Sequence, residues 1–101
     1  MSLHTTLHRF LDILTIEIED LENDLIDLIQ LAQQRLQRRE ITNYVFLENR
    51  SLLLNELACL KTVVSTLRGL DTSRYVDIKD MVADVEQRIH KHSLDLSLIH
   101  I

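Results

Sequence analysis

Residues that make tight turns are almost absent from this sequence. It contains no proline and a single glycine, Gly69, in 101 residues. Loops and β-turns depend on these two residue types, because glycine reaches positive φ values and proline fixes φ. Their scarcity argues against a fold with many tight connections and favours long helices joined by few turns.

Cysteine and aromatic residues are also scarce. The one cysteine, Cys59, has no partner for a disulfide within the chain, which fits a reducing compartment. Aromatic residues make up 4% of the chain and hydrophobic residues 46%, so we expect a core of Leu, Ile and Val. No apolar run approaches the roughly 18 residues that span a bilayer, and the first residues lack a signal-peptide pattern. We therefore expect a cytoplasmic protein without a membrane partner.

A strong positive charge is the next missing feature. The net charge is −5, whereas proteins that bind nucleic acids usually carry a basic face that neutralises phosphates. The only dense positive cluster is formed by Arg35, Arg38 and Arg39. Nucleic acid is therefore a disfavoured partner, and a nucleic-acid role would need this cluster to be paired across a dimer.

A repeating apolar stripe predicts one long amphipathic helix over residues 3–39. Alternate steps of four and three residues give a period of 3.5, which is typical of a helix that lays one face against partner helices. Arg35 and Arg39 continue the register, and cations suit the C-terminal end of a helix dipole. The apolar positions of the stripe are Leu7, Leu11, Leu14, Ile18, Leu21, Leu25, Leu28 and Ala32.

Two further helices are predicted, over residues 43–68 and 72–92. Thr42 is an acceptable N-cap for the second helix, which is apolar around most of its circumference. Gly69 follows its last turn, where we expect glycine to take the left-handed conformation. Asp71 then caps the third helix. The stripe of the third helix is Tyr75, Ile78, Val82, Val85, Ile89, His92, Leu96 and Ile99.

These elements predict an all-α fold, a single domain of three antiparallel helices, because short connections make neighbouring helices antiparallel. A helix that continues through residues 40–42 is the alternative. Folding the second helix back places Arg68 near Asp12 and Lys61 near Asp20. The first helix is longer than its partners, so apolar residues off its stripe would stay exposed, and such patches usually mark an interface. We therefore predict a homodimer with contacts from Ile13, Ile16, Ile26, Ile29, Leu31, Leu47 and Leu54.

Acidic residues form the densest group of side chains that could bind a metal ion. Carboxylates from one or two helices can hold Mg²⁺ beside a substrate phosphate. The bundle would bring five of them towards one end: Asp20, Asp24, Asp77, Asp80 and Asp84. Glu19 and Glu22 resemble half of the acidic motif of all-α nucleotide pyrophosphohydrolases. The second half of that motif, Glu-x-x-Asp at the expected distance, is missing, and a solvated helix face explains these residues more simply.

Three hypotheses for function follow. The first is a small helical protein–protein interaction or dimerisation module that has no catalytic residue, no cofactor and no metal, and that binds a second copy or another protein. The second is a Mg²⁺-dependent phosphohydrolase-like enzyme that uses the acidic faces. The third is a helical nucleic-acid-associated regulator. The surplus of apolar surface favours the first, while the partner, the orientation of the dimer and the order of residues 93–101 stay open.

Overall fold

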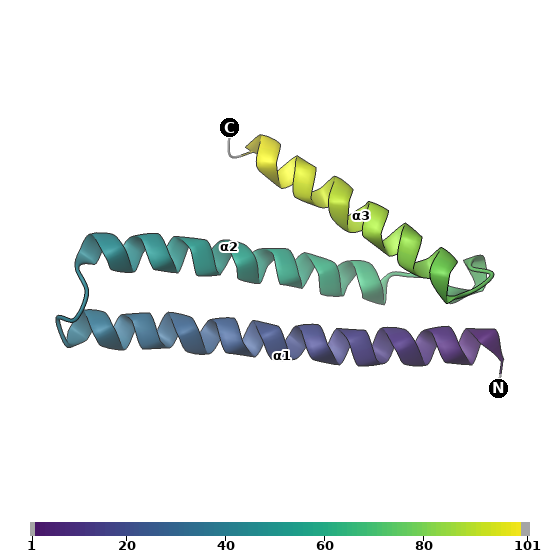
Figure 1. Ribbon diagram of the computed structural model, residues 1–101, viewed down its shortest axis with the longest axis horizontal. Helices are drawn as coiled ribbons and strands as arrows, with labels where there is room; N and C mark the ends of the chain where they lie inside the picture. The colour runs from purple at the N-terminus through teal and green to yellow at the C-terminus, as the bar shows by residue number, and fades with distance from the viewer. Residues whose placement is uncertain (1, 100–101) are drawn as a thin grey trace.

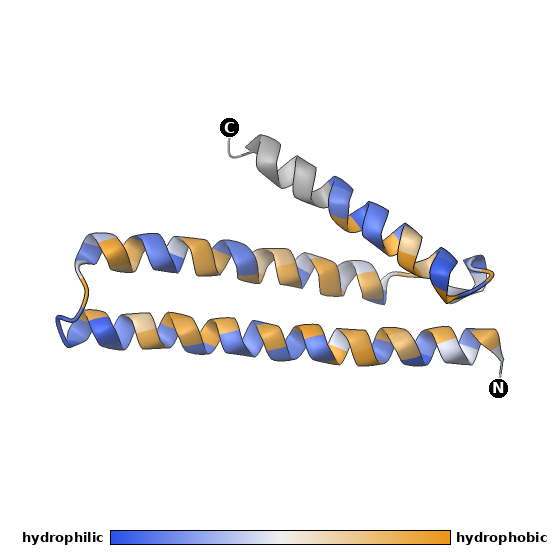
Figure 2. Cartoon of the chain, viewed as in Figure 1, coloured by the Kyte–Doolittle hydropathy of each residue, from blue (hydrophilic) through white to orange (hydrophobic). Residues whose placement is uncertain are grey.

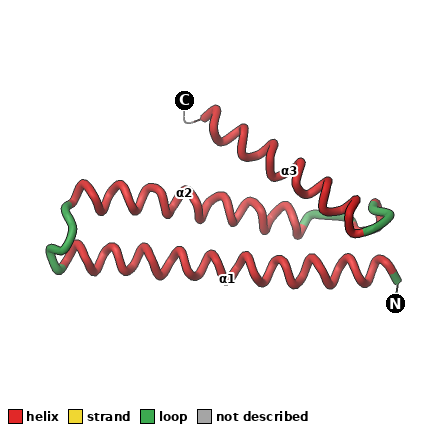
Figure 3. Tube along the Cα trace, viewed as in Figure 1, coloured by secondary structure: helices red, strands yellow, loops and turns green. Residues whose placement is uncertain are grey.

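The structure is a computed structural model that describes the backbone of residues 2–99 and the side chains of residues 2–91. Within these residues it contains three α-helices, one short 3-10 helix and no strand, which confirms the predicted all-α class. α1 (Leu3–Gln37) and α2 (Asn43–Arg68) form an antiparallel hairpin, as Figure 1 shows. The 3-10 helix η1 (Thr72–Arg74) and α3 (Ile78–Ile99) follow. Figure 3 shows a short loop joining α1 to α2 and a longer connection, which contains η1, joining α2 to α3.

Both ends of α1 are fixed by local hydrogen bonds. Ser2 is the N-cap, and its side chain accepts a hydrogen bond from the Thr5 backbone N–H. At the other end the N–H of Glu40 donates to the Arg35 carbonyl, and the N–H of Arg39 donates to the Leu36 carbonyl. This pair of bonds is a Schellman motif, which needs a left-handed residue after the C-cap. Arg39 fills that position with φ 60°.

The left-handed conformation of Arg39 predicts a stabilising substitution. A side chain with a Cβ is strained at positive φ, whereas glycine is not. We expect Arg39→Gly to raise the free energy of unfolding by about 0.5–1 kcal/mol in urea titrations. Arg38→Gly is the matched control, because it removes the same charge from a residue with φ −82°. That variant is expected to lose stability; a loss in both variants would contradict the expected strain.

The prediction for Gly69 was wrong. Gly69 is the C-cap of α2 with φ −86°, so the chain leaves this helix without a left-handed residue. A Cβ at Gly69 would lie 3.5 Å from the Ser65 carbonyl oxygen, which is ordinary contact. The start of α2 is as predicted, with Thr42 accepting a hydrogen bond from the Val45 N–H. The turn that demands positive φ is the other one, at Arg39.

The start of the third helix also differs from the prediction. Asp71 caps η1 by accepting hydrogen bonds from Ser73, and the chain is then extended at Tyr75. α3 begins at Ile78, with Asp77 accepting a bond from the Asp80 N–H. Asp71 and Asp77, six residues apart, are therefore both able to cap the start of the third helix. Tyr75 between them is buried, with 9% of its surface exposed, and this burial favours the start at Asp77. The predicted stripe positions His92, Leu96 and Ile99 lie outside the described side chains.

The core lies at one end of the hairpin. It joins the first half of α1, the last turns of α2, Tyr75 and the first turns of α3, and α3 then diverges from the hairpin (Figure 1). Leu7 and Met81 have no exposed surface. The hairpin beyond Ile18 and Leu60 is therefore a two-helix layer. The buried members of the core are Leu7, Leu11, Ile18, Val64, Leu67, Tyr75, Met81 and Val85.

The predicted stripe of α1 is only partly the buried one. Leu7, Leu11, Ile18 and Ala32 are buried, but Leu21 is 51% exposed and Leu28 is 47% exposed. A straight helix has 3.6 residues per turn, so a repeat of seven residues drifts by about 20° each time. Leu21 and Leu28 therefore rotate away from α2, whereas Leu25 stays half-buried and Ala32 stays buried. Residues off the predicted stripe that are also half-buried are Glu22, Ile29 and Leu36.

Candidate functional site

Residues of α1 and α2 line a groove beyond the core, called here the apolar groove. It has a volume of about 610 Å³. Its polar lining residues are the acidic Asp24 and Glu56 together with Asn55. Figure 2 shows apolar residues along α1 and α2 far beyond the part of the hairpin near the start of α3. The apolar lining consists of Leu21, Leu25, Leu28, Leu52, Cys59 and Leu60.

The apolar groove continues the surface on which α3 packs. Phe10 and Leu14 of α1 line a small hollow with Met81 and Val82 of α3. Leu14, Leu21 and Leu28 follow one another at intervals of seven residues, so they lie along one side of α1. On α2, Leu60 packs against the core and also lines the groove. One apolar face thus runs along the hairpin, covered by α3 at one end and open at the other.

The open part of this face is unusually exposed for large apolar side chains. Leu52 is 57% exposed, beside Leu21 and Leu28 at about half. Cys59 is also exposed on the same side of α2, seven residues after Leu52. Contiguous exposed apolar surface on a small soluble domain usually marks a contact with another molecule. The groove is therefore the candidate binding surface.

The seven residues predicted for the interface do not gather in one place. None of them lines the apolar groove. Ile29 is half-buried on the side of α1 that faces α2, and Ile16 lines a different hollow with Glu19 and Arg68. The other five are each more than a third exposed: Ile13, Ile26, Leu31, Leu47 and Leu54. The signal that was missed is the spacing of seven in Leu14, Leu21 and Leu28, which sequence reasoning assigned to the contact with partner helices within the bundle.

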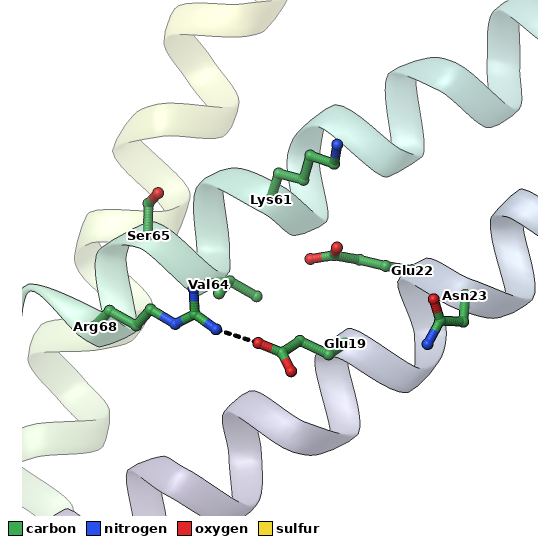
Figure 4. Close-up of a pocket in the computed structure, with 7 residues that line it drawn as sticks. All are labelled: Glu19, Glu22, Asn23, Lys61, Val64, Ser65 and Arg68. Carbon is green, nitrogen blue, oxygen red and sulfur yellow. Dashed lines mark hydrogen bonds and ion pairs between the residues drawn. The ribbon is translucent and has the colours of Figure 1, made fainter.

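The opposite side of the hairpin carries a polar pocket of about 450 Å³, shown in Figure 4. Arg68 of α2 donates a hydrogen bond to Glu19 of α1, and this ion pair joins the two helices. Lys61 lies along the same pocket as Glu22 (Figure 4). The sequence had placed Arg68 near Asp12, and these two residues line a neighbouring hollow together with Glu19. Both acidic and basic side chains line this pocket. Such a lining suits ion pairs that join two helices better than a binding site for either a cation or an anion.

The five acidic residues proposed as a metal site lie in different surroundings and do not form one cluster. Asp20 and Asp24 are exposed on α1, and Asp77 and Asp80 make capping bonds around the start of α3. Asp84 accepts hydrogen bonds from Tyr75 and Arg88. Among the described residues, no group of three or more His, Cys, Asp or Glu side chains is placed to hold a metal ion.

Tyr75 links η1 to α3 through Asp84. The Tyr75 hydroxyl donates to Asp84 Oδ2 at 2.5 Å, and Arg88 Nε donates to the same oxygen at 3.0 Å. The Tyr75 bond, followed by Arg88, lowers the pKa of the Asp84 carboxyl below its usual 3.8. Burial, then the Asp84 hydrogen bond, raises the pKa of Tyr75 above 10.0. This contact holds the first turns of α3 at the core end of the hairpin.

The depressed pKa of Asp84 predicts how Tyr75→Phe changes acid stability. A carboxyl with a lowered folded-state pKa stabilises the fold above its ordinary pKa and loses that contribution as the pH falls through the folded value. We expect Tyr75→Phe to lower the urea midpoint at pH 7, and the difference from wild type to shrink below about pH 4. Tyr44→Phe is the control, since Tyr44 is 75% exposed. A deficit that stays constant with pH would contradict this.

The N-terminus of α1 is tied to η1 by a polar contact. His4 Nδ1 hydrogen-bonds the hydroxyl of Thr72, which is 4% exposed. The rings of His4 and His8 are stacked with centroids 6.1 Å apart.

At the other end of the hairpin, Arg35 forms a loose ion pair with Glu40, with 3.9 Å between Arg35 Nε and Glu40 Oε2. The predicted arginine cluster therefore lies at the hairpin tip, far along α1 from the core.

Comparisons with known proteins give no relative: no family model, no curated protein and no solved structure matches this chain. Within the described residues, no helix combines the length and the apolar character needed to cross a membrane. The class that the fold and the surface define is therefore an all-α protein with a helical hairpin, a core at one end and an open apolar groove beside it.

Proposed function

We propose that this protein is a small helical protein–protein interaction module that dimerises and has no catalytic activity of its own. The observation that carries the proposal is the apolar groove, an open continuation of the face that α3 covers at the core end. A third helix is present for only part of the hairpin, since α3 diverges from it (Figure 1). In the proposed dimer, helices of the second copy complete the bundle along the remaining part.

The energy available supports an association of this kind. Full burial of a leucine side chain gains about 1.5–3 kcal/mol over the exposed state. Leu21, Leu28 and Leu52 each have about half of that burial still to gain. Each copy would contribute the same residues to a two-fold interface, which doubles the gain. A cytoplasmic location is part of the proposal, because a lone exposed thiol such as Cys59 suits a reducing compartment.

The test is the mass in solution, measured by light scattering on a sizing column across a dilution series. We expect a species of twice the 11.9 kDa chain mass that dissociates only on dilution. Dissociation should follow a single monomer–dimer equilibrium, since a two-fold interface closes on itself. A mass of 11.9 kDa at every concentration up to the solubility limit would overturn the dimer.

A further inference from the structure

We infer that two copies pack groove to groove with their hairpins antiparallel, so that Arg35 of each copy lies between Glu17 and Asp24 of the other. The inference rests on the proposed dimer and adds its orientation, its register and its ion pairs. The position of α3, the length of the uncovered hairpin and the distribution of charge support it independently.

The position of α3 decides the orientation. α3 packs on the same face of the hairpin as the apolar groove, at the core end, through Met81, Val82 and Val85. In a parallel dimer the two core ends would meet, and both copies of α3 would need the same space between the hairpins. In an antiparallel dimer the first turns of each α3, which pack on the hairpin, lie beyond the hairpin tip of the other copy. The antiparallel arrangement therefore buries the groove without displacing these turns from the core.

The length of the uncovered hairpin sets the register. On α1 it runs from Ile18, the last α1 residue of the core cluster, to the helix end at Gln37, a length of about 28 Å. Its midpoint is next to Leu28. On α2 it runs from Asn43 to Leu60, and its midpoint is next to Leu52. Full overlap of two antiparallel copies places α1 on α1 and α2 on α2, with Leu28 and Leu52 each beside its own symmetry copy.

The charges fit this register. With Leu28 at the two-fold axis, Arg35 lies seven residues beyond it and faces Leu21 of the second copy. Glu17 and Asp24 flank Leu21 by about one turn on either side and are exposed. A parallel dimer would instead place α1 of each copy on α2 of the other, so that Arg35 would not lie beside Glu17 and Asp24 of the second copy. The acidic residues between positions 10 and 34, where no Lys or Arg occurs, are Asp12, Glu17, Glu19, Asp20, Glu22, Asp24 and Asp27.

Cysteine cross-linking tests the orientation. Leu52→Cys and Leu28→Cys are each made in a Cys59→Ser background and treated with a short bismaleimide. We expect each variant to cross-link to itself, because each position lies at the two-fold axis. Wild-type Cys59 is the control: seven residues from Leu52, it should lie about 21 Å from its copy along α2 and should not cross-link. Light scattering on each variant verifies that it remains dimeric.

The outcomes separate the inference from the proposed function. In a parallel dimer α1 of one copy faces α2 of the other. A mixture of the Leu28→Cys and Leu52→Cys chains would then form a cross-link between the two different variants, and neither variant would cross-link to itself. That result, or a stable dimer without any cross-link at these positions, overturns the antiparallel groove contact and leaves the dimer standing. A monomeric mass for the wild-type chain overturns both.

A charge reversal tests the register independently. Arg35→Glu should weaken the dimer about five- to tenfold, because one exposed ion pair is lost at each of two symmetric positions. Adding Glu17→Arg and Asp24→Arg should restore the affinity. Arg38→Glu at the same hairpin tip is the control and should have a smaller effect. Equal effects of the two reversals, or no recovery in the triple variant, would contradict the proposed pairing.

Discussion

Leu28→Asp is expected to convert the dimer into a monomer. In the isolated chain Leu28 is 47% exposed, so an aspartate there meets water and the hairpin still forms. In the proposed dimer the side chain is buried at the two-fold axis beside its own copy. The variant would bury two carboxylates next to one another, and an uncompensated buried charge costs about 3–5 kcal/mol. We expect the dissociation constant to rise by at least about 1,000-fold in light scattering on a dilution series.

Ile13→Asp is the matched control for this experiment. Ile13 lies on the same helix, is 58% exposed and does not line the groove, although the sequence had suggested it for the interface. We expect the Ile13→Asp chain to keep the mass of a dimer. Circular dichroism should show the same helix content for both variants. Loss of the dimer in Ile13→Asp with retention in Leu28→Asp would place the interface outside the groove and contradict the groove contact.

Local chemistry explains why the helix class and several helix ends could be predicted from the sequence. Capping depends on a few neighbouring residues, so Ser2 and Thr42 act as N-caps in the structure as their type suggests. The same local rules failed where two candidates competed. Asp71 and Asp77 can both start a helix, and the burial of Tyr75 in the core between them decides that α3 begins after Asp77.

The two tight turns show why composition alone was insufficient. Glycine is the usual residue at a left-handed position, so the sequence pointed to Gly69. The structure uses Arg39 there instead, held by the Schellman bonds and by the ion pair of Arg35 with Glu40. Such a position has no composition signal, because the strain at Arg39 is offset by contacts that form only once the turn exists.

The candidate groove was missed for a geometric reason. A stripe in alternate steps of four and three residues suggested that partner helices cover Leu21 and Leu28, but the drift of a straight helix moves both residues to the side of the α2 contact. Whether a residue at the margin of a stripe is covered depends on the path of the third helix. α3 diverges after the core (Figure 1), and this divergence leaves the groove open. The path of α3 is a tertiary property that periodicity does not encode.

Met81→Ala is expected to cost a large part of the folding stability. Met81 has no exposed surface and joins α3 to the core formed by α1 and α2. Truncation of a buried methionine to alanine removes apolar contacts and leaves a cavity, at a cost of about 2–5 kcal/mol. That loss is a large fraction of the roughly 5–15 kcal/mol by which domains of this size are usually stable. We expect a clearly lower urea midpoint at a fixed protein concentration, since dimerisation also contributes to apparent stability.

The position of Met81 also determines what should happen to the dimer. The core lies at the opposite end of the hairpin from the tip, so the groove residues Leu28 and Leu52 do not depend on Met81 for their exposure. At low urea the Met81→Ala chain should therefore still have the mass of a dimer, although it unfolds earlier. Leu47→Ala, at a position 60% exposed, is the control and should change stability by less than about 0.5 kcal/mol. Equal losses in the two variants would contradict a core concentrated at one end, because stability would then depend on the hairpin as a whole.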